Sequence, residues 1–423
     1  MELARGEQYR RTARRLTLVL FLAQSLASAG FIAAATVGSI VGADLSREPA
    51  WAGVPSGVYL LSGAVAALGW GFAMDRIGRR GGMSLGLAMG VVGAAIAAGA
   101  IVAESFLLFL GGLTLMGSAN AAVQLGRFAA AEVHLPDEKG RAISNVVVGG
   151  TVGAVVGPLL VGPTGQWMSD VGFNELAGPY AVGSFLFAVG LILVHTRLRP
   201  DPRELGREVA RLHAESGTVA QAAPRDLSEI LRDPTVRVAM VAMVFAQVVM
   251  VMLMVITSLH MKVHHHSLAG ISVVVSSHTL GMYAFSVLSG RLTDRWGRGQ
   301  VIIAGSFVLL LSCLMAPVST DLVPLSVALF LLGLGWNFCY VGGSSLLSDQ
   351  LSPEERARTQ GLNDLFIGVA AAAGSLSSGA IFATVGYGAM GVIGAAASVV
   401  PLAFTARWLI RPPSPVARSS TWM

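Results

Sequence analysis

Sulfur and imidazole side chains are concentrated in one part of this 423-residue chain. Six of its sixteen methionines fall between Met240 and Met261, and among them Met250 and Met254 share a helical face. His278 and Met282 follow, again one helical turn apart. Thioether sulfur is a soft, neutral ligand and imidazole suits copper, so Met250, Met254, His278 and Met282 predict a Cu(I) site. The same stripe is also typical of methionines that only fill gaps between helices.

The elements that must position these residues are membrane-spanning helices. Of the residues, 54% are hydrophobic and 13% charged, and the mean hydropathy is +0.67. These values exclude an ordinary water-soluble domain. Apolar runs of the ~20 residues that cross a bilayer recur along the chain. They predict an all-α membrane protein with twelve transmembrane helices in two six-helix halves, at 16–42, 53–74, 82–103, 105–131, 142–167, 177–196, 236–259, 268–290, 300–318, 321–348, 359–384 and 387–409.

A charged, polar segment separates the two groups of six helices. We therefore expect an N-terminal bundle over 1–196, a cytoplasmic linker over 197–235, a C-terminal bundle over 236–410 and a cytoplasmic tail over 411–423. Basic residues alternate between successive loops in the way that the positive-inside rule requires, which predicts cytoplasmic N- and C-termini. No cleavable signal precedes the first helix, so we expect that helix to remain attached. The expected location is the bacterial inner membrane, which the chain would cross several times.

The net charge of +5 does not indicate nucleic acid, because the basic residues lie at helix ends. Both cysteines, Cys313 and Cys339, fall in apolar runs and are expected to be buried thiols. The expected surroundings are the lipid bilayer, with the protein as a monomer.

Two loop motifs repeat along the chain. The string around Asp75 returns around Asp294, and the string that begins at Pro136 returns at Pro353. The offset in the sequence is nearly the same for both. Because two unrelated motifs recur at nearly the same offset, they predict parallel structural repeats.

The first of these strings resembles the cytoplasmic signature of the major facilitator superfamily. The resemblance implies that fold, transport by alternating access, and a role of the signature in stabilising one conformation. Physically, its glycines would let the helix end pack closely and turn, and its aspartate would accept hydrogen bonds. The predicted gating residues are Gly71, Asp75, Arg76, Gly78, Arg79, Gly290, Asp294, Arg295, Gly297 and Arg298.

The fifth expected helix carries the run Gly153 to Pro158, which resembles a motif of proton-coupled antiporters in that superfamily. Close packing of small residues is the favoured interpretation of this run. Those antiporters carry an arginine in the fourth helix, where this chain has Leu113. Export of drugs by antiport is therefore less favoured.

Ionisable residues inside membrane helices are functional candidates because their burial is costly. Arg127, Glu132 and Asp364 are the candidates for coupling here. Arg127 is expected to pair with Glu132 or Asp364, or else to extend toward the membrane surface.

Counting along the helices gives the depth of the predicted metal ligands. At 1.5 Å per residue, Met250 lies ~13 Å and His278 ~15 Å below the outer surface, so both reach a similar level near the midplane. MxxxM followed by HxxxM resembles the bacterial copper importers of the superfamily that supply copper for assembly of cbb3-type cytochrome oxidase. This resemblance implies copper as the transported substrate, with no permanent cofactor and no enzymatic activity.

A short tract between these two helices adds a possible site of periplasmic metal capture. Its members are His260, Met261, His264, His265 and His266. A solvated loop that merely exposes histidine is the alternative.

The alternative function is proton-coupled transport of an organic solute, either drug efflux or riboflavin-like uptake. The methionines would then form an adaptable apolar surface. Such a pocket should include Trp70, Trp336, Phe338 or Tyr340.

Overall fold

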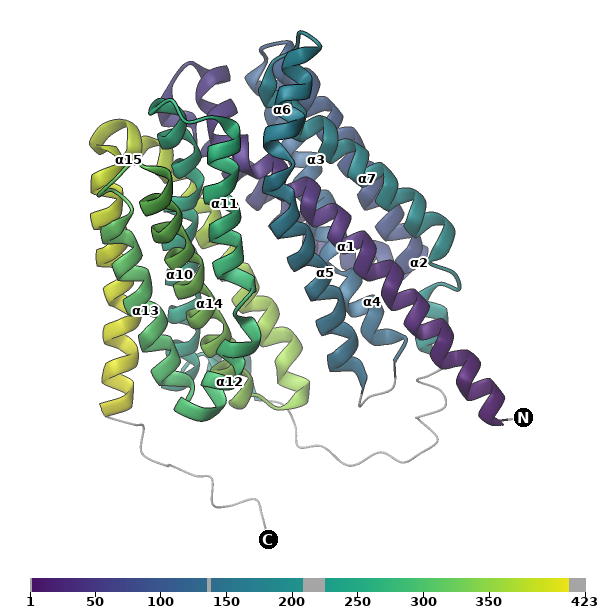
Figure 1. Cartoon of the computed structure of the whole chain (residues 1–423). Coiled ribbons are helices and arrows are strands. Elements are labelled where there is room, and N and C mark those ends of the chain that lie inside the picture. Colours follow the sequence, from purple (N-terminus) through teal and green to yellow (C-terminus); the bar gives the residue numbers. More distant parts are fainter. Residues whose placement is uncertain (1, 135–137, 208–224, 411–423) are drawn as a thin grey trace. The chain divides into compact units, whose positions relative to one another are not determined.

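The structure, a computed structural model, describes residues 2–134, 138–207 and 225–410, and within these ranges every regular element is a helix (Figure 1). The long elements are α1 (Glu2–Ser46), α2 (Val54–Val102), α3 (Phe106–Gln124), α4 (Gly126–Glu132), α5 (Lys139–Leu159), α6 (Val161–Asp170), α7 (Gly178–Arg197), α10 (Pro234–Val263), α11 (Leu268–Tyr283), α12 (Ser286–Trp296), α13 (Arg298–Met315), α14 (Leu322–Asp349) and α15 (Pro353–Ile410). Short helical turns are η1 (Pro49–Trp51), η3 (Glu175–Ala177) and α9 (Leu227–Ile230). The predicted tail over 411–423 lies outside the described residues.

Ten helices of the described chain are long and apolar enough to cross a membrane, so the protein is a multi-pass membrane protein, and the predicted count of twelve is not confirmed. Two of these candidates, Pro49–Val102 and Thr359–Ile410, are 54 and 52 residues long. One crossing takes ~20 residues. Gly78 in α2 and Gly386 in α15 interrupt the helices with φ of 83° and 78°. Each of these long helices therefore has the length for two crossings and a glycine break between them.

Several spans that the sequence predicts as single helices are divided in two. The predicted helix over 142–167 forms α5 and α6, and Pro158 lies in the last turn of α5. Proline has no N–H to donate and its ring crowds the preceding turn, so it favours a break at this point. The predicted helices over 105–131 and 268–290 are likewise divided, into α3 with α4 and α11 with α12.

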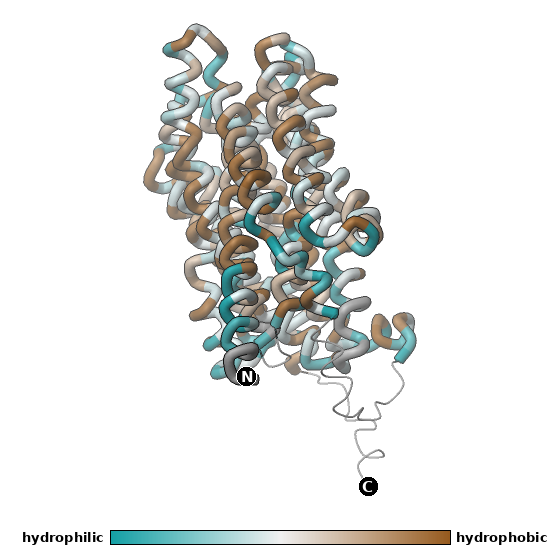
Figure 2. Tube along the Cα trace, turned by 90° about the vertical axis from the view of Figure 1, so that its right-hand side faces the viewer, coloured by the Kyte–Doolittle hydropathy of each residue, from teal (hydrophilic) through white to brown (hydrophobic). Residues whose placement is uncertain are grey.

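The surface of the helices is apolar over long stretches. Figure 2 shows hydrophobic residues along most of their length and hydrophilic residues at many helix ends. Leu107 and Phe72 are 81% and 76% exposed. Large exposed side chains of this kind are unfavourable in water, whereas lipid solvates them.

The chain divides into two compact units. Unit 1 comprises Met1–Gln221, Val255–Ser276 and Ser378–Ala383, and unit 2 comprises Ala222–Met254, Ser277–Ser377 and Thr384–Met423. The predicted domain boundaries stay a prediction.

Small residues bring the helices of unit 1 together. A Cβ atom added to Gly153 of α5 would lie 2.1 Å from the carbonyl oxygen of Ser25 on α1, and one added to Gly112 of α3 would lie 2.6 Å from that of Gly93 on α2. Only residues without a side chain permit such an approach. Close packing is therefore the role that the structure gives to the glycine-proline run of α5.

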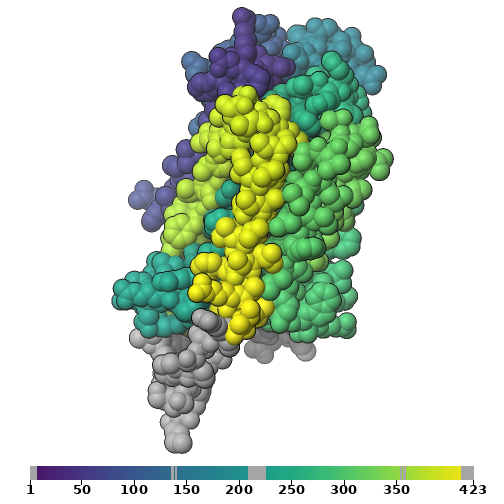
Figure 3. All heavy atoms as spheres, turned by 90° about the vertical axis from the view of Figure 1, so that its left-hand side faces the viewer, coloured from purple at the N-terminus to yellow at the C-terminus, as the bar shows by residue number. Residues whose placement is uncertain are grey.

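Similar contacts organise unit 2. Figure 3 shows the part of α15 that follows Gly386 on the surface beside α13. A Cβ atom added to Gly391 of α15 would lie 2.6 Å from the carbonyl oxygen of Cys313. Cys313 and Cys339 are both buried free thiols, as expected.

Candidate functional site

The four predicted metal ligands all belong to unit 2, two on α10 and two on α11. Met250, His278 and Met282 are buried, and Met254 is half-buried. In the described chain no three His, Cys, Asp or Glu side chains are grouped in a way that could hold a metal ion. A metal bound here would depend on the methionine sulfurs. The metal site stays a prediction, because burial alone does not bring four ligands to one point.

His278 is hydrogen-bonded through only one of its two ring nitrogens. Its Nδ1 lies 3.0 Å from the carbonyl oxygen of Leu329 on α14, and its buried Nε2 has no hydrogen-bond partner among the described residues. A proton on Nδ1 satisfies that carbonyl and leaves the Nε2 lone pair available. Histidines that bind metals generally donate their other N–H in this way. His278 therefore has the arrangement of a ligand or an acceptor.

Close packing of α11 on α14 explains this position. A Cβ atom on Gly333 of α14 would lie 2.2 Å from the carbonyl oxygen of His278, and a Cβ atom on Gly281 of α11 would lie 2.2 Å from that of Phe330. Because both contact residues are glycines, the two backbones approach closely. The imidazole then reaches the neighbouring backbone directly.

Two aromatic rings contact the indole of Trp336 on α14. The rings of Trp336 and Tyr340 are stacked, with centroids 4.8 Å apart and planes 18° apart, and Tyr283 of α11 meets Trp336 edge-on at 6.4 Å. Gln247 of α10 accepts a hydrogen bond of 2.8 Å from the indole N–H. The described chain gives Gln247 no second bond, so its amide N–H groups are available as donors. We call Gln247, Tyr283, Trp336 and Tyr340 the aromatic cluster.

Asn337, next to the aromatic cluster, is bonded at both ends of its amide. It is buried, and its Nδ2 donates to the carbonyl oxygen of Met282 at 2.6 Å and to the hydroxyl of Ser286 at 3.0 Å. The hydroxyl of Ser289 donates to its Oδ1. These bonds join α14 to the end of α11 and the start of α12. Asn337 therefore holds the break between those helices, and its role is structural.

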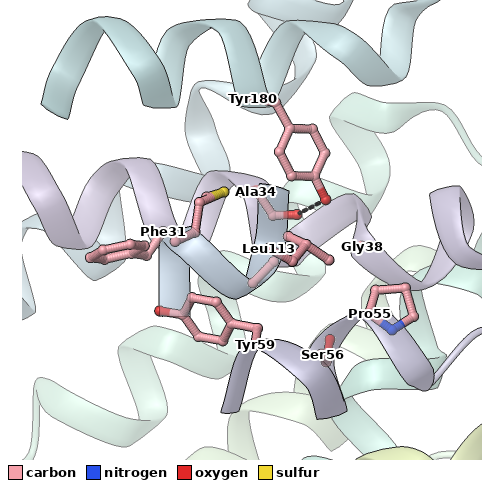
Figure 4. Close-up of a pocket in the computed structure, with 10 residues that line it drawn as sticks. Phe31, Ala34, Gly38, Pro55, Ser56, Tyr59, Leu113 and Tyr180 are labelled. Carbon is pink, nitrogen blue, oxygen red and sulfur yellow. Dashed lines mark hydrogen bonds between the residues drawn. The ribbon is translucent and has the colours of Figure 1, made fainter. Parts of the chain in front are cut away.

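Unit 1 contains a small hollow among α1, α2, α3 and α7, of about 290 Å³ when the open space at its mouth is counted (Figure 4). Tyr180 donates a hydrogen bond of 3.1 Å to the carbonyl oxygen of Ala34, and the ring of Tyr59 lies 5.8 Å from that of Phe31. Leu113 lines the hollow at the sequence position where the antiporters have arginine. This hollow therefore has an aromatic and aliphatic wall without a fixed charge.

Trp70, another aromatic residue predicted for an organic-solute pocket, is hydrogen-bonded between two helices of unit 1. Its indole N–H donates to the backbone oxygen and the hydroxyl of Ser118, at 2.9 Å and 3.1 Å. The bond joins α2 to α3. Trp70 is buried by this packing, unlike the half-buried Tyr340.

The histidine tract is partly helical, because α10 continues to Val263, beyond the predicted end at 259. The rings of His260 and His264 lie 4.4 Å apart, while Met261 is 1% exposed. Lys262 is bound to Glu175 at 2.6 Å. Any capture of metal from solvent would thus fall to the histidines, including the exposed His265 and the half-buried His266, and it stays a prediction.

The repeated signature forms the same charge cluster in each unit. In unit 1, Arg79 binds Asp75 of its own helix at 2.8 Å and Glu132 of α4 at 2.5 Å. In unit 2, Arg298 binds Asp294 at 3.3 Å and Asp349 of α14 at 3.0 Å. Arg79 thereby ties the part of α2 that follows Gly78 to the end of α4, and Arg298 ties the start of α13 to the end of α14.

The sequence reasoning missed Asp349. In the sequence, Asp349 follows Glu132 at the same offset at which Pro353 follows Pro136 in the second loop motif. Adding the offset between the two loop motifs to the position of Glu132 would have identified Asp349.

The glycines of the signature have two kinds of surroundings. Gly78 and Gly297 have φ of 83° and 98°, so they turn the chain as expected. A Cβ atom on Gly71 or Gly290 would meet nothing within 4 Å among the described residues. The predicted close packing at Gly71 and Gly290 stays a prediction.

The predicted coupling residues have different surroundings. The carboxylate of Glu132 binds Arg79, as described above. The guanidinium of Arg127 lies 4.9 Å from the ring centroid of Phe128, a cation–π distance. Arg127 and Asp364 each take part in a further interaction, so neither is a free charge. A coupling role for Arg127, Glu132 and Asp364 stays a prediction.

The repeated signature clusters, the glycine breaks and the apolar helix surfaces together define a multi-pass helical membrane protein with an internal repeat. Comparison with known families identifies the superfamily: the Major Facilitator Superfamily matches residues 20–267 and 239–422, and the chain belongs to it.

Similar proteins agree with this assignment. The chain is 33% identical over 397 residues to the uncharacterized MFS-type transporter YdeG of Bacillus subtilis, covering 93% of this chain and 92% of the relative. It is 32% identical over 376 residues to the riboflavin transporter RfnT of Brucella anthropi, covering 89% and 91%. The nucleoside transporter NupG has a similar fold, with a TM-score of 0.68, 16% identity, and coverage of 94% of this chain and 99% of that structure.

Proposed function

We propose that this protein transports a planar aromatic solute of the riboflavin class by alternating access. The observation that carries the proposal is the aromatic cluster of unit 2, in which the stacked rings of Trp336 and Tyr340 lie beside a free amide donor of Gln247. The riboflavin transporter of Brucella anthropi, 32% identical over most of both chains, supports the choice of solute.

The chemistry of the cluster fits a flavin. Aromatic side chains stack on flat heterocycles, and an amide N–H donates to a ring carbonyl. Tyr340 is half-buried, so part of its ring remains open to a solute.

Uptake of radiolabelled riboflavin into cells that lack their own riboflavin transporter tests this proposal. Tyr340→Leu should lower initial uptake roughly tenfold, because stacking on one aromatic ring contributes about 1–3 kcal/mol. Gln247→Leu should also lower uptake, whereas Tyr340→Phe should retain most of it because the ring remains.

Trp296→Leu is the matched control, since Trp296 is an exposed aromatic residue of the same unit, outside the cluster. Membrane levels of each variant are measured by immunoblot. Wild-type cells that accumulate no riboflavin, or a Tyr340→Leu variant with wild-type uptake, would overturn the proposal.

Copper import by the predicted site of Met250, Met254, His278 and Met282 is the second candidate. The free Nε2 of the buried His278 favours it. The copper would be the transported substrate, held by neutral ligands that keep the path free of fixed charge. In right-side-out vesicles, copper accumulation measured by mass spectrometry should then fall several-fold in His278→Gln and Met250→Leu. Met315→Leu serves as the control, because Met315 lies at the end of α13, outside the predicted site. Equal accumulation in all of these variants would reject copper as the cargo.

A further inference from the structure

Unit 1 contains an arginine-lined pocket where the break of α2 meets the chain that follows α7. Five arginines line it, together with Asp201 and Glu204. The arginines are Arg76, Arg80, Arg199, Arg203 and Arg207. The pocket encloses about 930 Å³, counting the open space at its mouth. We call these residues the arginine pocket.

The backbone around this pocket is held by Asp201. Its Oδ1 accepts hydrogen bonds from the backbone N–H groups of Arg79 and Arg203, at 3.1 Å and 2.9 Å, and its Oδ2 accepts from that of Arg80 at 3.0 Å. The carboxylate is thereby committed to three backbone donors. This carboxylate therefore has little remaining capacity to accept hydrogen bonds from the guanidinium groups around it.

The five guanidinium groups have no acidic partner within the described chain. Every ion pair there that involves an arginine uses other residues, such as Arg79 with Glu132 and Arg225 with Glu355. Glu204 is exposed and does not bind any of the five. Counting only the residues that the structure describes, the pocket therefore has an excess of unpaired positive charge, which is unfavourable unless an anion or water occupies it.

The depth of the pocket indicates the source of the anion. The span that includes α7 ends at Arg197, and Arg199 follows closely after it. The break at Gly78 lies midway along the apolar candidate Pro49–Val102. A position where spans end and turn is the level of lipid headgroups, and basic pockets there bind anionic headgroups.

We infer that the arginine pocket is a binding site for a phosphate ester, supplied by the headgroup of an anionic phospholipid. Arginine is suited to this ligand because its planar fork donates two parallel hydrogen bonds to phosphate oxygens. The site is separate from the aromatic cluster, so it neither needs nor tests the proposed solute.

Native mass spectrometry of the full-length protein in detergent, with equimolar phosphatidylglycerol and phosphatidylcholine, tests the inference. The wild-type protein should retain phosphatidylglycerol preferentially. The double variant Arg80→Gln with Arg203→Gln should lose roughly tenfold or more in affinity for it, since it removes two of the five guanidinium groups that would hold the phosphate.

The double variant Arg199→Gln with Arg207→Gln should show the same loss. Both of these side chains are exposed, so this variant keeps the test valid if the first one fails to fold. The matched control is Arg11→Gln with Arg232→Gln, which removes two exposed positive charges outside the pocket and should keep the preference.

A competition arm distinguishes the two sources of phosphate. Displacement of the lipid by millimolar pyrophosphate would assign the site to soluble phosphate esters, and its failure would assign the site to lipid. Both results keep the anion site. Equal retention of the two lipids by wild type, or an unchanged preference in both pocket variants, would overturn it.

Discussion

Two buried polar side chains on adjoining helices differ in how fully they are hydrogen-bonded. Asn337 uses both ends of its amide on Met282, Ser286 and Ser289, whereas His278 uses only Nδ1. A buried polar group without a partner is costly, so an unsatisfied atom that persists is a candidate for ligand binding. This difference separates a structural residue from a candidate functional one.

Replacing Asn337 by alanine should destabilise the protein without changing its substrate. The carbonyl of Met282 would lose its bond to the amide, whereas the hydroxyls of Ser286 and Ser289 would keep their bonds to backbone carbonyls. The expected cost is about 1–3 kcal/mol for the one group left unsatisfied. We expect a thermal midpoint several degrees lower, measured by tryptophan fluorescence in detergent.

Ser326→Ala is the control for this change. Its hydroxyl donates only to the carbonyl of Leu322 in its own helix, so its loss should have little effect. A midpoint for Asn337→Ala equal to that of Ser326→Ala would show that the network does not stabilise the break.

At the scale of elements, the break inside α2 depends on one glycine. Gly78 has φ of 83° and ψ of 166°, and a Cβ atom there would lie 2.5 Å from Oδ2 of Asp201. Gly78→Ala should cost about 1–3 kcal/mol in backbone strain and also displace the carboxylate. The measurement is the thermal midpoint of the variant in detergent.

Gly69→Ala in the same helix is the comparison. A Cβ atom there meets nothing within 4 Å among the described residues, and alanine is the better helix former. We expect an unchanged or slightly raised midpoint. If both variants behave alike, the conformation at Gly78 is not required.

The segment before α10 is tied to the start of α15 by a buried carboxylate. Glu355 accepts hydrogen bonds from Nε and Nη2 of Arg225 at 2.9 Å and 2.8 Å, and from two backbone N–H groups. The bond to Arg225, followed by those to the backbone, lowers the pKa of Glu355 from 4.5 to about 2. The native state therefore favours the ionised carboxyl.

This pKa gives the stability of unit 2 a defined dependence on pH. The folded pKa lies below the unfolded one, so the stabilisation is complete above pH 4.5 and is lost as the pH falls toward 2. Glu355→Gln should lower stability at pH 7 by about 1.5–3 kcal/mol, since it removes hydrogen bonds to a charged group. The difference from wild type should shrink between pH 5 and pH 3 in denaturant titrations.

Glu7→Gln provides the control, because Glu7 forms an exposed pair with Arg11 that contributes little. It should match wild type at every pH. A Glu355→Gln deficit that stays constant down to pH 3 would contradict the assignment.

At the scale of the whole molecule, the repeat extends from sequence to charge clusters and breaks. Gly78 and Gly297 share a positive φ, and each is followed by an arginine that binds two acids. The long helices α2 and α15 are then each expected to cross the membrane twice, which would give twelve crossings.

Labelling of single cysteines in intact cells tests that count. The native cysteines are buried, so they give little background. With two crossings in α2 and a cytoplasmic N-terminus, Glu104→Cys should react with a membrane-impermeant maleimide from outside. One crossing would place the exposed Glu104 on the inside, protected until the membrane is permeabilised.

Two further positions control the labelling. Glu48→Cys, after α1, should react in intact cells with either count. Glu229→Cys should react only after permeabilisation if there are twelve crossings. Labelling of Glu229→Cys in intact cells, with Glu104→Cys protected, would reject the double crossing.

The sequence by itself determined the helical membrane class, the superfamily signature and its repeat. Hydropathy over ~20 residues and a repeated loop motif are local patterns. The thickness of the bilayer and the hydrogen bonding of the backbone require such patterns, however the helices pack against one another. The positions of most spans followed in the same way. The helix breaks near Leu125 and Ala284 did not, since no proline lies at either break, and Gly126 beside Leu125 is one of many glycines in these helices.

Only the tertiary structure decided which side chains are partnered. It bound Glu132 to Arg79, supplied Asp349 to the second cluster, placed Gln247 beside Trp336, and left Nε2 of His278 without a hydrogen bond. These contacts join residues that are far apart in the sequence and lie on different helices. The sequence shows on which face of a helix a side chain lies. It does not show which residue of another helix that side chain contacts, because this depends on how closely the two backbones approach.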